Sequence, residues 1–312
     1  MGYKIITDST IDMDHKMIEE LGLTVVPLRF TIDGKTYKDK ADLSDMPTET
    51  FYAKLREGKM STTSQINADE FTRVFEPVLQ GGEDVLYIAF SSGLSGTCQS
   101  AFIARDELKE KYPERKIYVF DSLCASLGEG LLVYHAAMLK RAGTDIDSLY
   151  KWLGENVLKL CHWFTVDDLN HLKRGGRVSP TVALVGTMLG IKPVMHMDNE
   201  GHLIKVGTAK GRPASLKALV DRMEETAVEP GKQTIFISHG DCLEDAQLLA
   251  EKVRAVAAPK DILIVPHEPF SGAHVGPGMV ALVFWGKDRR ESLSFTDRIA
   301  RRVRGKRDES AN

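Results

Sequence analysis

Short apolar runs alternate with longer amphipathic stretches through the first half of the chain. The run at residues 85–90 is too short for a typical helix and lies between paired glycines and a Ser/Gly cluster, so it predicts a buried parallel strand. From Cys98 the apolar residues follow helical spacing. Similar units of strand, polar loop and helix begin at residues 3–7 and 116–120. This alternation predicts a parallel, doubly wound sheet.

Between these units, residues 24–30 predict one more strand and residues 47–57 a helix. Residues 60–65 are rich in hydroxyl side chains, which indicates a loop ahead of a helix capped by Asn67. In the second half, strands around residues 192–196 and 203–208 predict a hairpin. The remaining elements expected there are helices at 213–226 and 243–256, strands at 234–238, 262–265 and 279–285, and a loop at 270–278. This half predicts a mixed sheet.

A chain of 312 residues exceeds the size at which single hydrophobic cores usually stop growing, about 250–300 residues. We therefore expect an α/β protein of two domains, a parallel doubly wound domain at residues 1–160 and a mixed-sheet α/β domain at residues 161–301. A short basic tail, residues 302–312, would follow. Ligands of such sheets bind beyond the carboxyl ends of the strands, where the polar loops of this chain fall.

Charge and composition exclude several classes of protein. A net charge of −3 provides no general positive field for nucleic acid. The four cysteines are widely spaced, so they indicate neither a zinc site nor a disulfide framework. No apolar run approaches the ~20 residues of a membrane span, so stable membrane insertion is not expected. These features are typical of a cytoplasmic globular protein without a metal or another cofactor.

The loop after the strand at residues 85–90 reads SSGLSGT and comes directly before a helix. Hydroxyl groups and the unpaired N–H groups of a helix start can bind a carboxylate or a phosphate. A simpler interpretation is that the hydroxyls only cap the helix. The polar candidates are Ser91, Ser92, Ser95 and Thr97, and Gly93 and Gly96 would let the backbone approach a ligand.

Five motifs in order give the chain a specific resemblance. They are Asp8-Ser9-Thr10, Thr63-Ser64-Gln65, the SSGLSGT loop, Gly175-Gly176-Arg177 and His274-Val275-Gly276-Pro277-Gly278. With these motifs the sequence resembles the DegV family of fatty-acid-binding proteins, which includes the binding subunit of bacterial fatty acid kinase. The resemblance extends from the first strand to about Trp285.

The resemblance implies a function and a set of site residues, with a ligand at and beyond the domain junction. The tail of a long-chain fatty acid such as palmitate or oleate would be buried, and its carboxylate would be bound by Thr63 or Ser64, Ser92 or Ser95, and His274. A separate ATP-dependent fatty acid kinase would then form the acyl phosphate for phospholipid metabolism in the bacterial cytoplasm. The chain itself would not be an enzyme.

Two basic residues are possible supports for the head group, Arg177 and Lys210. Lys210 stands where the family often has arginine, and an ammonium group lacks the planar fork of a guanidinium. Ile66 follows Thr63-Ser64-Gln65 where the family often has proline. The apolar residues within 182–189, with Met195 and Phe270, are a reasonable lining for an acyl chain, although they also suit an ordinary core.

An enzyme is the alternative class. Ser95 and His274 could act as the nucleophile and base of an acyl hydrolase. The local sequence around Ser95 lacks the last glycine of the GxSxG motif, and no carboxylate is known to orient His274. Asp241, beside His239, could belong to a metal site but is better interpreted as a helix cap. The chain also lacks a Walker or Rossmann glycine pattern, so nucleotide chemistry is expected on a partner.

Overall fold

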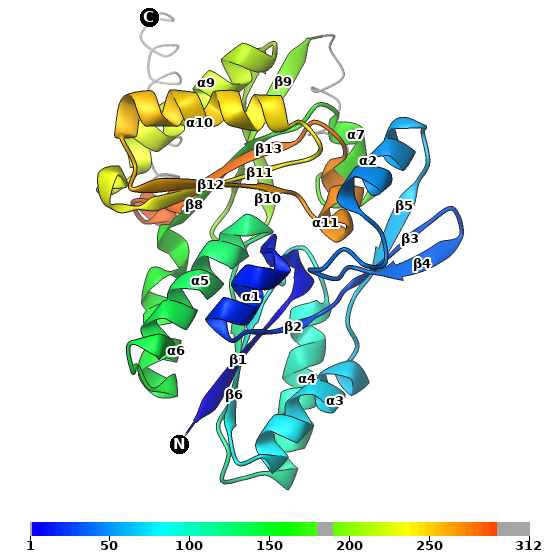
Figure 1. Cartoon of the computed structure of the whole chain (residues 1–312), viewed down its shortest axis with the longest axis vertical. Coiled ribbons are helices and arrows are strands. Elements are labelled where there is room, and N and C mark those ends of the chain that lie inside the picture. Colours follow the sequence, from blue (N-terminus) through cyan, green and yellow to red (C-terminus); the bar gives the residue numbers. More distant parts are fainter. Residues whose placement is uncertain (1, 180–189, 292–312) are drawn as a thin grey trace, which may run out of the picture.

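Two sheets, each covered by helices, form the protein in a computed structural model that describes residues 2–179 and 190–291 (Figure 1). The N-terminal sheet has four strands in the order β2-β1-β6-β7, and each strand is parallel to its neighbours. Its strands are β1 (Tyr3–Asp8), β2 (Thr24–Val26), β6 (Asp84–Ala89) and β7 (Ile117–Asp121).

Both faces of this sheet are buried. Along β6, Val85 and Tyr87 pack in one hydrophobic cluster, whereas Leu86 and Ile88 pack in another on the opposite face. Such burial explains the unbroken apolar run and confirms the predicted doubly wound sheet. The first face is covered by α3 (Ala68–Gln80) and α4 (Thr97–Lys111), and the second by α1 (His15–Leu21), α5 (Leu127–Arg141) and α6 (Ile146–Asn156).

The second sheet is mixed, as expected. Its six strands run in the order β10-β9-β8-β13-β11-β12, and only the β11–β12 pair is parallel. Figure 1 shows α9 and α10 on one side of this sheet and α5 on the other. The bounds are β8 (Leu160–Thr165), β9 (Ile191–Met197), β10 (Leu203–Lys210), β11 (Thr234–His239), β12 (Asp261–Pro266), β13 (Val280–Trp285), α9 (Arg212–Thr226) and α10 (Leu243–Ala257).

A third, three-stranded sheet projects beside the other two (Figure 1). It consists of β3 (Arg29–Ile32), β4 (Lys35–Lys38) and β5 (Ser61–Ser64), with α2 (Thr48–Arg56) nearby. The short helix α11 (Pro269–Val275), from the C-terminal part of the chain, packs against this unit through Ala273. The remaining elements are α7 (Leu169–Arg174) and the single turns η1 (Ser9–Ile11), η2 (Val157–Lys159) and η4 (Pro230–Lys232).

Three sequence predictions are wrong in the region of the three-stranded sheet and α11. Residues 24–30 are not one strand, because β2 and β3 belong to different sheets on either side of Pro27, which has no N–H for a sheet. The expected loop at 60–65 contains β5, whose threonines suit a strand paired with β3. The expected loop at 270–278 contains α11, which begins with Pro269 and is capped by the Glu268 carboxylate.

Other local predictions are confirmed. Asn67 caps α3, since its side chain accepts a hydrogen bond from the Glu70 N–H at 2.9 Å. The paired glycines follow the end of α7, and the hairpin of β9 and β10 turns at residues 198–202. The domain boundary after residue 160 stays a prediction; this residue is the first of β8, and α5 packs against both sheets. The proposed tail, residues 302–312, lies outside the described residues.

No helix within residues 2–179 and 190–291 is both long and apolar enough to cross a membrane.

Candidate ligand-binding site

A cavity with an accessible volume of about 70 Å³ lies between the loop after β6 and the second sheet. Most of its wall is apolar and includes Phe164 of β8, Met197 of β9 and Phe270 of α11. Of the expected lining, Phe270 is in the wall, whereas Met195 is buried in the core beside Phe164. Residues 182–189 lie outside the described part of the chain.

His274 stands where this cavity meets a second, more polar pocket. Its Nε2 lies 2.8 Å from Oγ1 of Thr63, which borders the polar pocket from β5. Its Nδ1 faces Gly175, where the Cβ of any other residue would be only 2.2 Å away. Two of the predicted site residues, from motifs 211 positions apart, are therefore in direct contact.

The protonation state of His274 determines what this pair can bind. Burial, together with the charge of Arg177, lowers the pKa of His274 from 6.5 to about 4. The ring is therefore neutral at pH 7 and carries one N–H. When Nε2 donates this hydrogen to Thr63, the Thr63 hydroxyl is free to donate its own hydrogen to an anion in the polar pocket.

The SSGLSGT loop has a different geometry. Ser95 is buried and its Oγ lies 2.9 Å from Oγ1 of Thr97, at the start of α4. Ser92 is exposed and its backbone N–H donates to Asp121. Leu94 provides the loop's contact with the cavity. The hydroxyls of Ser95 and Thr97 are therefore paired with each other at the start of α4, although no side chain caps this helix, and Ser91 Oγ donates instead to the Gly201 carbonyl.

The two glycines of that loop stand at close approaches between segments. A Cβ at Gly93 would lie 2.8 Å from the carbonyl oxygen of Gly201, in the turn between β9 and β10. A Cβ at Gly96 would lie 2.2 Å from Oε1 of Gln65. Gly93 faces backbone atoms and therefore requires glycine, whereas Gly96 faces the end of a flexible glutamine side chain; both bring the loop against other parts of the chain.

Of the remaining candidates, Arg177 is the one that borders the site. It lines both pockets, and its guanidinium donates from Nε to the Leu94 carbonyl at 3.1 Å and from Nη1 to the carbonyl of Gly175. Burial lowers the pKa of Arg177. Ser64 and Lys210 are exposed, and neither lines either pocket.

Sequence reasoning missed a buried polar cluster beside the cavity. Nδ1 of His267 lies 2.9 Å from both Oδ2 of Asp12 and Oγ of Ser126, and Asp12 Oδ1 also accepts from the Glu268 N–H. Burial raises the pKa of Asp39 to about 7 and that of Glu268 well above its usual range. Asp12 follows the Asp8-Ser9-Thr10 motif closely, but nothing in the sequence indicates that it meets His267.

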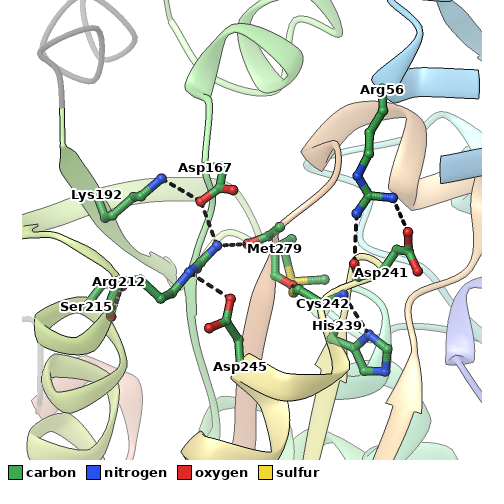
Figure 2. Close-up of polar contacts among 11 residues, drawn as sticks. Arg56, Asp167, Lys192, Arg212, Ser215, His239, Asp241, Cys242, Asp245 and Met279 are labelled. Atoms are coloured by element: carbon green, nitrogen blue, oxygen red, sulfur yellow. Dashed lines mark hydrogen bonds and ion pairs between the residues drawn. The ribbon is translucent and has the colours of Figure 1, made fainter. Parts of the chain in front are cut away.

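A network of ion pairs outside the cavity stabilises the glycine turn that follows α11. Figure 2 shows Arg212 between two acidic side chains, with Nη2 2.6 Å from Oδ1 of Asp167 and Nε 3.0 Å from Oδ2 of Asp245. The same Nη2 donates to the carbonyl of Gly278 at 2.6 Å. A Cβ at Gly278 would lie 2.2 Å from Asp167 Oδ2, so this turn also requires glycine.

The expectation that Asp241 caps a helix is wrong. α10 follows Cys242 as its cap residue, and no side chain caps it. The Asp241 carboxylate instead pairs with Arg56 of α2 (Figure 2), a partner 185 positions away that local sequence cannot indicate. Within residues 2–179 and 190–291, no group of three or more His, Cys, Asp or Glu side chains could hold a metal ion.

Comparison with known proteins gives the family. A sequence model of the DegV family, described as an uncharacterised protein family, matches residues 3–287. The chain belongs to the DegV family. It is 47% identical over 284 residues to a DegV domain-containing protein of Clostridium perfringens. This match covers 91% of this chain and 97% of the relative.

Solved structures of DegV proteins share the whole fold. One from Thermus thermophilus, described as binding fatty acid, has a TM-score of 0.81 and 30% identity, and covers 92% of this chain and 100% of its own. DegV from Bacillus subtilis, described as a fatty acid binding protein, has a TM-score of 0.79 and 27% identity. The match covers 92% of this chain and 99% of the Bacillus chain. The predicted family and two-domain α/β class are thus confirmed.

The lowered pKa of His274 predicts a pH-dependent stability. An unfolded chain takes up a proton at this ring near pH 6.5, but the folded protein does so only near pH 4, so the free energy of unfolding falls as the pH falls through this window. The contribution is at most about 3 kcal/mol. Urea unfolding between pH 4 and 7 should give a shallower dependence for His274→Gln than for the wild type. Because all other histidines remain in both proteins, equal slopes would contradict the assigned pKa.

Proposed function

We propose that this protein binds one long-chain fatty acid, such as palmitate or oleate, with its tail in the cavity and its carboxylate at the His274–Thr63 pair. The observation that carries the proposal is an apolar cavity that ends at two polar side chains beside a polar pocket. Burying some 14 methylenes at about 0.8 kcal/mol each gives on the order of 10 kcal/mol before the costs of association. The descriptions of the DegV proteins of Thermus and Bacillus support the same ligand class.

Thr63 is the proposed direct ligand of the carboxylate, His274 orients the Thr63 hydroxyl through Nε2, and Arg177 adds positive charge at the same place. The oxygen of a carboxylate can accept from the Thr63 hydroxyl without a full ion pair. Ser95, with Gly93 and Gly96, shapes the adjoining loop. Ser64 and Ser92, which are exposed, and Lys210 remain weaker candidates that would have to contact the head group from outside the cavity.

The protein is proposed to be a carrier rather than an enzyme. Ser95 Oγ is hydrogen-bonded to Thr97, whereas His274 Nε2 is hydrogen-bonded to Thr63, so the pair needed for the hydrolase alternative is not hydrogen-bonded. The polar pocket beside His274 is lined by the exposed residues Lys59 and Arg174. A separate ATP-dependent kinase docked there could reach the carboxylate and form an acyl phosphate in the bacterial cytoplasm, as a step of phospholipid metabolism.

Protein purified from bacteria should carry fatty acid in near-stoichiometric amount, because transfer of the tail to water opposes its release. Mass spectrometry of the extracted lipid measures this directly. Ala281→Phe, which places a larger side chain in the cavity wall, should reduce the yield of lipid per protein. Extracts without acyl chains, together with no binding of added palmitate or oleate, would refute the proposed function.

Removal of the Thr63 hydroxyl should weaken fatty acid binding by about 1–3 kcal/mol, since a desolvated carboxylate loses a donor. Thr63→Val preserves shape and can be measured by displacement of a fluorescent fatty acid. Thr31→Val is the matched control. Thr31 lies in the neighbouring strand β3, its hydroxyl is hydrogen-bonded to that of Thr36, and it borders neither pocket. Equal loss in both variants would place the carboxylate elsewhere.

The loaded protein should support acyl phosphate formation only when a fatty acid kinase and ATP are added. Labelled oleate, a bacterial fatty acid kinase and ATP form the complete reaction, and omission of the kinase is the control. ATP consumption by this chain alone would contradict the carrier. Hydrolysis of acyl esters that is lost in Ser95→Ala would support the hydrolase alternative.

A further inference from the structure

The inner part of the cavity is not wholly apolar. His267, two residues before the start of α11, also lines the cavity. Its Nδ1 contacts Asp12 and Ser126, whereas its Nε2 is buried and has no hydrogen-bond partner among the described residues. A neutral ring whose Nδ1–H donates to Asp12 leaves a lone pair on Nε2.

A second histidine borders the same place. His162 of β8 lines the cavity, and its ring packs on Gly128, where a Cβ would lie 1.5 Å from Nε2. The Leu160 carbonyl lies close enough to act on its pKa, but neither ring nitrogen forms a hydrogen bond within the described residues. Exposed fractions of 4% for His162 and 2% for His267 exclude bulk water from both rings.

Ser271 adds a third polar group. It lies on α11 between His267 and His274, lines the cavity and has a buried hydroxyl without a partner in the described structure. A plain methylene chain packed against these three side chains would leave all of them desolvated and unpaired, which is unfavourable at each one. A ligand atom that both donates and accepts a hydrogen bond would satisfy His267 Nε2 and one neighbour together.

The charge of the surroundings limits what this group can be. Asp12 lies directly behind His267, and Asp39 and Glu268 are buried nearby. The ionised form of a second carboxylate would be disfavoured by burial beside these acidic side chains, two of which are themselves shifted toward the neutral form, whereas a hydroxyl carries no charge. The inner subsite therefore suits a neutral oxygen, and the ionised head group belongs at the mouth with Arg177.

We propose that His162, His267 and Ser271 form a specificity subsite for an oxygen on the acyl chain, so that this protein prefers fatty acids that carry a hydroxyl group in mid-chain. The inference rests on the proposed fatty acid binding and adds the substrate class. His267 accepts the hydrogen of the ligand hydroxyl, and His162 or Ser271 donates to its oxygen.

The test measures the affinities of octadecanoic acid and of a series of its monohydroxy derivatives. The acids compete for binding to the full-length protein after its bound lipid has been removed. The wild type should bind at least one mid-chain derivative about tenfold more tightly than octadecanoic acid, with weaker binding when the hydroxyl is near the methyl end. His162→Leu replaces a polar ring of the subsite by an apolar side chain and should abolish the preference for the hydroxylated acid. His135→Leu is the control, because His135 lies on α5 outside the cavity wall.

The outcomes separate the two proposals. Tight binding of octadecanoic acid without any preference would overturn the subsite, because water would then satisfy the histidines, and would leave the proposed function intact. Binding of none of the acids would overturn both. A preference that survives in His162→Leu and in Ser271→Ala would overturn the assignment to these residues, and Ser271→Ala also provides the measurement if His162→Leu does not fold.

Discussion

The ring of His274 is fixed by contacts with two segments that are remote in the sequence. On one side Gly175 leaves room for the ring only because it has no side chain, and on the other Thr63 forms the hydrogen bond to Nε2. These residues follow α7 and lie in β5, respectively, while His274 itself lies on α11. The mouth of the cavity therefore exists only where all three segments pack together, and each of them constrains the other two.

A second set of close backbone contacts holds the two main sheets around the cavity. Gly93 lies against the Gly201 carbonyl, which also accepts a hydrogen bond from Ser91 Oγ at 2.8 Å. Arg177 reaches the same loop through the Leu94 carbonyl. Each of these contacts ends on a backbone carbonyl, so they fix the position of the loop at the edge of the cavity. The space that remains is apolar in its walls and polar at defined points.

This arrangement is suited to holding a ligand more than to transforming it. Burial keeps His274 neutral at pH 7, and its Nε2 is engaged by a threonine that is a weak nucleophile. Thr97 pairs with the hydroxyl of Ser95, and no ring nitrogen is hydrogen-bonded to that serine. The polar groups of the site are thus placed as hydrogen-bonding partners, while the larger part of the binding energy is expected from the apolar wall.

The sequence by itself determined the layers of the fold, the family and most of the helices. Continuous apolar runs require burial on both faces, and caps such as Asn67 act within a few residues, so both are encoded locally. The five motifs also identified Thr63, His274 and Arg177 as candidates near the ligand. Their contact could not be derived from the sequence, because spacing along the chain gives no distance between separate segments.

Only the tertiary structure decided the rest. The strand β5 forms because β3 is available to pair with it, and α11 forms in a glycine-rich segment that packs against α2 and β3. Asp12 and His267 meet across 255 positions. Local patterns record propensity and burial, whereas a buried polar pair depends on how all of the intervening elements pack. The cavity and its polar inner end are therefore properties of the folded chain and not of any one motif.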